Sequence, residues 1–121
     1  MLLKYYYKKN RLILFWHIGK YVYQSRKNKF KSYREISMFL KYYFGFTDMF
    51  SISSIKNMEK FYVSFPVYTE VLERLDWKFY EKLLLFNDTD LRMIYFRVAI
   101  FSECEFSDFE RTISNRIIER I

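Results

Sequence analysis

The chain has 121 residues, which suffices for one hydrophobic core and is too short for two. Its residues are 51% hydrophobic and include only two glycines and one proline, so a disordered segment is excluded and a helix-rich globular protein is indicated. The 14 Phe and 12 Tyr also suit stacking platforms for single-stranded nucleic acid, but a biased codon composition explains them more simply.

The formal charge of +7 is unevenly distributed along the chain. Residues 1–64 carry 13 Lys or Arg against 3 Asp or Glu, whereas residues 65–121 carry 8 against 11. A basic half joined to a mildly acidic half favours one surface for a polyanion and another surface for a different partner. Solvated lysines without any partner remain an open alternative.

The chain has one cysteine, Cys104, which excludes an internal disulfide and a cysteine-based zinc site within one chain. This usage fits a reducing cytoplasm. The apolar run "LILFW" at 12–16 is too short for a membrane span or for the core of a signal peptide. We therefore expect a cytoplasmic protein with no export signal and no membrane partner.

A long first helix is predicted from the helical spacing of apolar residues near the start. Its inward stripe comprises Leu12, Phe15, Trp16, Gly19 and Tyr23. Gly19 weakens a helix, so we expect a neighbouring helix to pack closely there. The basic stretch "QSRKNKFK" at 24–31 is predicted to end the helix and form an exposed connection.

The segment "SYRE" predicts a capping box in which Ser32 and Glu35 satisfy each other's backbone amides at the start of a second helix, 33–44. Gly45 is predicted to end this helix. The inward stripe of this helix is predicted to be Ile36, Phe39, Leu40 and Tyr43.

After a turn, "FGFTDMFS", Ser51 or Ser54 is expected to cap a third helix at about 53–64. Pro66 closes this helix, because the residue before a proline avoids helical angles. The inward positions are predicted to be Ile55, Met58, Tyr62 and Phe65.

Three further helices are predicted to follow a short segment, "TEVLERL". The first is capped by Asp76 and the second by Asp88, and a second capping box opens the third. The inward residues are Trp77, Tyr80 and Leu84 in the first; Leu91, Tyr95, Val98 and Ala99 in the second; and Phe109, Ile113 and Ile117 in the third, after the Ser107–Glu110 box. No segment has the alternation of a confident strand, so the prediction is a mainly α, compact bundle of about six helices forming one domain, 1–121.

Catalysis has little support in the sequence. His17 lies in an aromatic helix, where a packed imidazole is expected rather than a general base. Cys104 has no nearby histidine and is interpreted as an inert thiol. There is no glycine-rich phosphate loop, and the acidic residues are scattered. We therefore expect no enzyme activity, no metal site and no cofactor.

Two consecutive capped helices, 33–44 and about 53–64, have the outline of a helix-turn-helix, although the joint is longer than usual. In such a unit the early exposed positions of the second helix face DNA bases, and nearby basic residues contact phosphates. The predicted base-facing residues are Ser53, Ser54, Lys56, Asn57 and Lys60, and the predicted phosphate contacts are Arg26, Lys27, Lys29, Lys31, Arg34 and Lys41. Glu59, predicted on the exposed side of the second helix, argues against this reading because a carboxylate repels phosphate.

The chain contains, in this order, the segments "LFWHIGKYV", "FSISSIKNMEKFYVSFP", "LERLDWKFYEKLL", "RMIYFRVAI" and "FSDFERTI". Together they resemble the N-terminal domain of YhcG-type proteins, a family with a C-terminal PDDEXK nuclease domain. The resemblance covers residues 12–113. The matching positions are Trp16, Ile18, Gly19, Gly45, Phe50, Ser51, Met58, Phe61, Tyr62, Phe65, Pro66, Leu75, Trp77, Tyr80, Tyr95, Ala99, Ile100, Ser107 and Glu110.

The resemblance implies a winged-helix-like DNA-binding module that delivers a nuclease to its target. Three positions depart from the family pattern: Glu59 replaces an arginine, Phe79 a histidine and Ser54 an asparagine. The chain lacks the carboxylate and lysine cluster of a PDDEXK centre. We therefore expect a non-catalytic targeting module from a split or truncated nuclease system, or a small regulator of a mobile element.

The expected partner is duplex DNA, with a nuclease subunit or another protein as a further candidate and a homodimer left open. The alternative hypothesis is a protein interaction module: a phage- or plasmid-borne factor that docks on a host protein, or a dimerisation domain. The aromatic surplus and Glu59 favour this alternative, and an exposed patch of Phe and Tyr would strengthen it.

Overall fold

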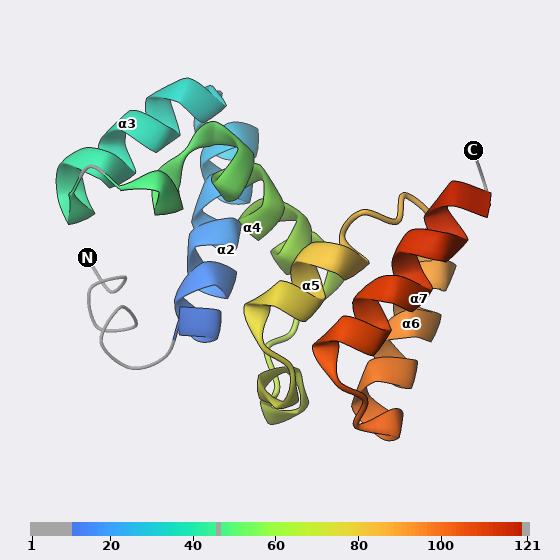
Figure 1. Ribbon diagram of the computed structural model, residues 1–121. Helices are drawn as coiled ribbons and strands as arrows, with labels where there is room; N and C mark the ends of the chain where they lie inside the picture. Colours follow the sequence, from blue (N-terminus) through green and yellow to red (C-terminus); the bar gives the residue numbers. More distant parts are fainter. Residues whose placement is uncertain (1–10, 46, 120–121) are drawn as a thin grey trace. The chain divides into compact units, whose positions relative to one another are not determined.

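A computed structural model describes residues 11–45 and 47–119 (Figure 1). Side chains are described up to Asn115. These residues form six α-helices and two short 3-10 helices and contain no strand, so the mainly α prediction is confirmed. The elements are α2 (Arg11–Lys29), α3 (Tyr33–Phe44), η1 (Asp48–Phe50), α4 (Ile52–Ser64), η2 (Glu70–Arg74), α5 (Trp77–Leu83), α6 (Thr89–Ser102) and α7 (Phe106–Glu119).

The chain forms two compact units that divide between Tyr68 and Thr69. No charged residue lies between 65 and 68, so this structural boundary also separates the basic part of the sequence from the acidic part. The single domain over 1–121 stays a prediction.

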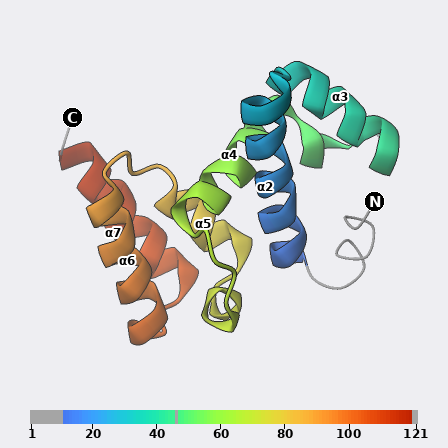
Figure 2. The ribbon, with the colours of Figure 1, turned by 180° about the vertical axis from the view of Figure 1, so that it is seen from behind.

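In the first unit, α2 packs along α4, and both views show the two helices side by side (Figures 1 and 2). Gly19 makes this approach possible, because a Cβ there would lie 2.6 Å from the Met58 carbonyl carbon and closer still to its oxygen. The close packing predicted at Gly19 is confirmed. The core of the unit includes Leu14, Ile18 and Val22 from α2, Ile36 and Leu40 from α3, and Ile55, Met58 and Phe61 from α4.

The helix α2 is longer than predicted, because it continues to Lys29 through most of the basic stretch. Lys, Arg and Gln are good helix formers, and Ser25 is buried against the unit, so nothing interrupts the helix there. The connection is only 30–32. Phe30 adopts a left-handed φ of 53°, and the Lys31 amide donates to the Ser25 carbonyl at 3.2 Å.

The start of α3 is as predicted: the Glu35 amide donates to Ser32 Oγ at 3.1 Å, and the Ser32 amide donates to the Glu35 carboxylate at 3.4 Å. Gly45 ends the helix with a φ of 115°. The predicted stripe is partly wrong, because Phe39 is 37% exposed and Tyr43 is half-buried. The buried face instead includes Ser37, whose hydroxyl donates to the Phe50 carbonyl at 2.5 Å and ties α3 to η1.

The helix α4 is capped by Ser51, whose Oγ accepts from the Ser54 amide at 3.2 Å. Ser54 is therefore not the cap. The helix ends at Ser64, just before Phe65 and Pro66, as predicted. The indole nitrogen of Trp16 donates to the Phe65 carbonyl at 2.7 Å and so anchors the end of α4 on α2. Ile55, Met58 and Phe65 are buried as expected, whereas Tyr62 is half-buried.

In the second unit, η2 and α5–α7 enclose a core that includes Leu72, Tyr80, Leu83, Phe109 and Ile113. The Tyr80 hydroxyl donates to the Leu72 carbonyl at 2.6 Å. Tyr80 and Leu84 are buried as predicted, and Trp77 is half-buried. Asp76 occupies the N-cap position of α5 but makes no side-chain cap hydrogen bond. Asp88 does cap α6, accepting from the amides of Asp90 and Leu91 at 2.9 and 3.2 Å.

The predicted face of α6 is partly wrong, since Val98 is 44% exposed and Leu91 and Tyr95 are half-buried. The buried face consists of Arg92, Phe96, Ala99 and Ile100. The physical reason is Arg92, whose guanidinium turns inward and donates to the Phe86 carbonyl. The spacing of apolar residues in the sequence does not predict that an arginine is buried because it donates a hydrogen bond to a loop carbonyl.

The second capping box is wrong, because α7 begins at Phe106 and places Ser107 inside its first turn. The Phe109 amide donates to the Glu105 carbonyl at 3.1 Å instead. Phe109 and Ile113 are buried as predicted, and the Ile117 side chain lies outside the described side chains. Across the described ranges, no helix combines the length and the apolar character needed to cross a membrane.

Candidate nucleic-acid interface

Four of the five residues predicted to face DNA bases lie together on one side of α4. Ser53, Lys56, Asn57 and Lys60 line a shallow surface pocket of about 450 Å³, and Tyr33 from α3 forms the rest of its lining. We call this the Tyr33 pocket. Residues three and four apart share a helix face, which is why 53, 56, 57 and 60 converge. No carboxylate lines the pocket, and all five side chains can donate hydrogen bonds.

Glu59 does not lie on the exposed side of α4, as the sequence analysis expected; the residue is only 8% exposed. Arg26 Nη1 donates to both of its carboxylate oxygens at 2.9 Å, and the Tyr33 hydroxyl donates to Oε1 at 2.5 Å. The burial of Glu59 depends on the extra length of α2, because the added helical turns bring Arg26 next to Glu59 of α4. The carboxylate is thus buried and paired with a cation, which reduces the repulsion expected of Glu59.

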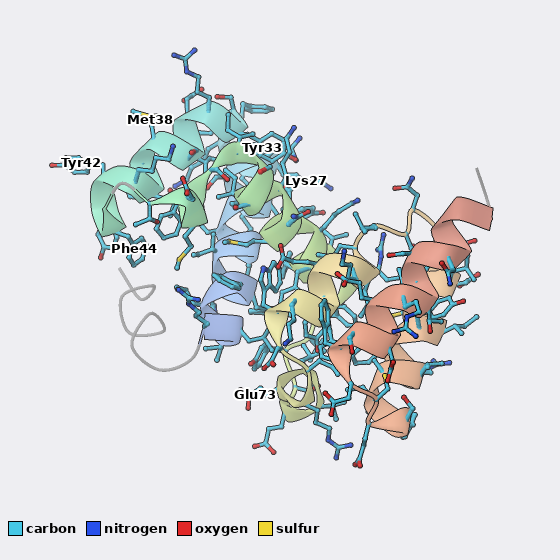
Figure 3. All side chains as sticks on the ribbon, viewed as in Figure 1. Lys27, Tyr33, Met38, Tyr42, Phe44 and Glu73 are labelled. Carbon is cyan, nitrogen blue, oxygen red and sulfur yellow. The ribbon has the colours of Figure 1, made fainter. Side chains whose placement is uncertain are left out.

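Tyr33 lies at the N-terminal end of α3 (Figure 3), and the charged groups of two basic residues lie close to its ring. Arg26 Cζ is 4.1 Å and Lys56 Nζ is 5.0 Å from the centroid of the Tyr33 ring, both within cation–π range. Burial, the hydrogen bond to Glu59 and the Glu59 charge together raise the pKa of Tyr33 to about 12. The hydrogen bond to Glu59 is the main cause that raises the pKa of Arg26. Tyr33 therefore stays protonated and Arg26 stays charged at physiological pH.

Ser54, the fifth predicted base-facing residue, is half-buried and serves the start of α4. Its hydroxyl donates to the Asp48 carbonyl at 3.2 Å, and the Ser51 hydroxyl donates to it at 2.9 Å. Ser54 therefore links η1 to α4 and is not in the lining of the Tyr33 pocket.

The six predicted phosphate-contacting residues are not gathered as tightly as those of α4. Arg26 is partly exposed and pairs with Glu59. Lys27 Nζ lies 4.9 Å from the centroid of the Tyr23 ring, on the same exposed end of α2 as Lys29. Lys31 follows in the connection, and Arg34 is exposed in the first turn of α3. Lys41 lies in the last turn of α3, about 12 Å farther along that helix than Tyr33.

His17, the one histidine of the chain, lies in α2 of the first unit. Burial, and to a smaller extent Lys20, lower the pKa of His17, whose ring contacts Trp16 edge-on at 4.9 Å. In the second unit, Cys104 is one of the residues that line a pocket of about 650 Å³, together with Phe79 and Ile100. Among the described residues, no three His, Cys, Asp or Glu side chains are grouped as a metal site would require.

The sequence did not predict two features of the site: that Tyr33 lines the pocket, and that Glu59 is buried beside it. Tyr33 directly follows the capping serine, so its place at the start of α3 was predictable. Its contact with α4 was not, because Tyr33 and Glu59 are 26 residues apart and Arg26 and Glu59 are 33 apart. No local pattern encodes pairings of that separation.

Comparison of the chain with protein families, curated proteins and solved structures gave no match. The resemblance to the YhcG-type N-terminal domain therefore stays a prediction. The described residues contain no hairpin that would form a wing, so the winged-helix part of that prediction is not confirmed.

Proposed function

We propose that the first unit is a non-catalytic DNA-binding module that contacts duplex DNA through the exposed face of α4 and the basic end of α2. The supporting observation is the convergence of Ser53, Lys56, Asn57 and Lys60 on one pocket that no carboxylate lines. Asparagine can pair with adenine in the major groove, and lysine can contact guanine or phosphate.

Charge supports the same proposal. The first unit carries 13 Lys or Arg and only 3 Asp or Glu, and one of those carboxylates, Glu59, is paired with Arg26. A surface of this kind attracts the nucleic-acid backbone from a distance and gains free energy by releasing its counterions. We propose a cytoplasmic location, where DNA and reduced Cys104 coexist, and a role as a targeting subunit of a separately encoded nuclease or as a mobile-element regulator.

The test is binding of the full chain to a short fluorescent DNA duplex, measured by anisotropy between about 50 and 200 mM salt. We expect affinity to fall steeply with salt. The double variant Lys56→Glu with Lys60→Glu should abolish binding at the higher salt concentration.

The matched control is Lys78→Glu with Arg97→Glu, which makes the same change in formal charge on exposed positions of the second unit. This control should bind DNA nearly as well as the unmodified chain. If both double variants lose affinity equally, net charge alone drives binding and α4 is not the DNA-contacting surface. If the unmodified chain does not bind duplex DNA at all, the proposal fails.

A second candidate function, protein docking or dimerisation, is favoured by the outer face of α3. Met38 is 53% and Tyr42 82% exposed, and both project away from α2 and α4 (Figure 3). Exposed apolar side chains in neighbouring turns are typical of interaction surfaces. Analytical ultracentrifugation tests whether the chain dimerises through this face. The candidate requires that the unmodified chain is a dimer and that the double variant Met38→Glu with Tyr42→Glu is a monomer.

A further inference from the structure

The Tyr33 pocket brings two like charges together. Lys56 and Lys60 are one helical turn apart on α4, and both are exposed. Like charges at this spacing destabilise an isolated helix slightly. An anion held between them would relieve that repulsion, and Ser53 and Asn57 supply neutral hydrogen-bond donors in the same pocket.

A chain of contacts holds one of these cations in place. Arg26 donates a hydrogen bond to the Glu59 carboxylate, and Glu59 accepts another from the Tyr33 hydroxyl. The centroid of the Tyr33 ring lies 5.0 Å from Lys56 Nζ. The hydrogen bond restricts the ring, and the ring in turn restricts the flexible lysine. A side chain that is ordered before binding loses less conformational entropy when its ligand arrives.

We propose that the Tyr33 pocket binds a single phosphate group between Lys56 and Lys60, and that Tyr33 is a positioning residue for Lys56. This inference rests on the proposed function where the phosphate belongs to a nucleic-acid backbone. A free inorganic phosphate presents the same tetrahedral, anionic oxygens, although a backbone phosphodiester carries one negative charge and free phosphate carries up to two near neutral pH, so the experiment treats the two sources separately.

The first arm titrates the isotope-labelled full chain with inorganic phosphate at constant ionic strength and follows backbone and side-chain amide resonances. We expect saturable shifts centred on Ser53, Lys56 and Asn57. A chloride titration at matched ionic strength should leave these resonances unshifted. Equal responses to the two anions, or shifts spread evenly over the basic end of α2, would overturn the proposal that the Tyr33 pocket binds phosphate.

The second arm measures duplex DNA affinity for two variants of Tyr33. Tyr33→Leu removes the ring and should weaken binding by about 2- to 5-fold, the range expected for one exposed cation–π contact. Tyr33→Phe keeps the ring but loses the hydrogen bond to Glu59, so it should weaken binding by a smaller factor than Tyr33→Leu. Tyr42→Leu, on the outer face of the same helix, is the matched control and should bind like the unmodified chain.

The outcomes separate this inference from the proposed function. DNA binding that depends on Lys56 and Lys60 but not on the Tyr33 ring leaves the proposed function intact and overturns the positioning role. Phosphate shifts at the pocket without any duplex binding support the phosphate site and overturn the DNA function. Circular dichroism of each variant confirms folding. If Tyr33→Leu unfolds, Tyr33→Phe still tests the positioning role, because affinity equal to that of the unmodified chain would overturn the part assigned to the hydrogen bond with Glu59.

Discussion

Gly19 of α2 lies directly against the backbone carbonyl of Met58 in α4. An added Cβ would sit 2.6 Å from the carbonyl carbon and 3.1 Å from Tyr62 Cβ, so the two helices could not stay at their present separation. This contact sets how α4 lies on α2. It therefore sets where the lysines of α4 lie relative to Arg26 and Tyr33.

Replacing Gly19 by alanine should destabilise the protein by at least about 2 kcal/mol, because overpacking forces backbone shifts that the gain in helix propensity does not offset. Urea unfolding monitored by circular dichroism measures the change. Asn28→Ala, at an exposed position of the same helix, is the control and should change stability by less than about 0.5 kcal/mol. A Gly19→Ala protein as stable as the control would show that the helices are farther apart than described.

The Arg26–Glu59 pair should contribute to stability well beyond a surface ion pair. We expect a coupling free energy of about 1–3 kcal/mol from a double-mutant cycle with Arg26→Met and Glu59→Gln, because the carboxylate is largely buried and its partners would be left unpaired. The more exposed Lys82–Glu110 pair, at 3.0 Å, is the comparison and should give only about 0.2–1 kcal/mol. Equal coupling in the two pairs would contradict the structural role of Glu59.

Tyr33 should make stability depend on pH in the alkaline range. Its folded-state pKa of about 12 exceeds the ordinary value of 10.0, so the hydroxyl's contribution is complete below pH 10.0 and is lost as pH rises through about 12. The stability difference between the unmodified chain and Tyr33→Phe should therefore be constant up to about pH 9 and shrink above pH 10. A difference that does not change with pH would show that the phenol is not bonded to Glu59.

His17 should titrate below its ordinary pKa of 6.5, first because of burial and second because of Lys20. Its favourable contribution to stability is then complete above pH 6.5 and is lost as pH falls through the lowered folded-state value. As the chain has one histidine, its ring proton resonance reports this pKa directly. Lys20→Gln should move the pKa of His17 part of the way back toward 6.5, whereas Lys20→Arg should leave it unchanged. A pKa of 6.5 in the unmodified chain would show that neither burial nor Lys20 affects His17.

Much of the helical architecture was predictable from local sequence. The Ser32–Glu35 capping box, the Asp88 cap, the stop at Gly45 and the end of α4 before Pro66 are all present. Each depends on hydrogen bonds or steric limits within a few residues, which a sequence pattern contains completely. The same holds for the shared face of Ser53, Lys56, Asn57 and Lys60, which follows from helical periodicity alone.

Tertiary structure decided the rest. The extension of α2 to Lys29, the burial of Glu59 beneath Arg26 and Tyr33, and the inward turn of Arg92 all depend on partners from other elements. Charged side chains are assigned to the surface by any local pattern, because burial is costly for a charge unless a distant partner compensates it. Sequence therefore determined which residues α4 presents together, and only the fold determined that Glu59, from the same helix, is buried and paired with Arg26.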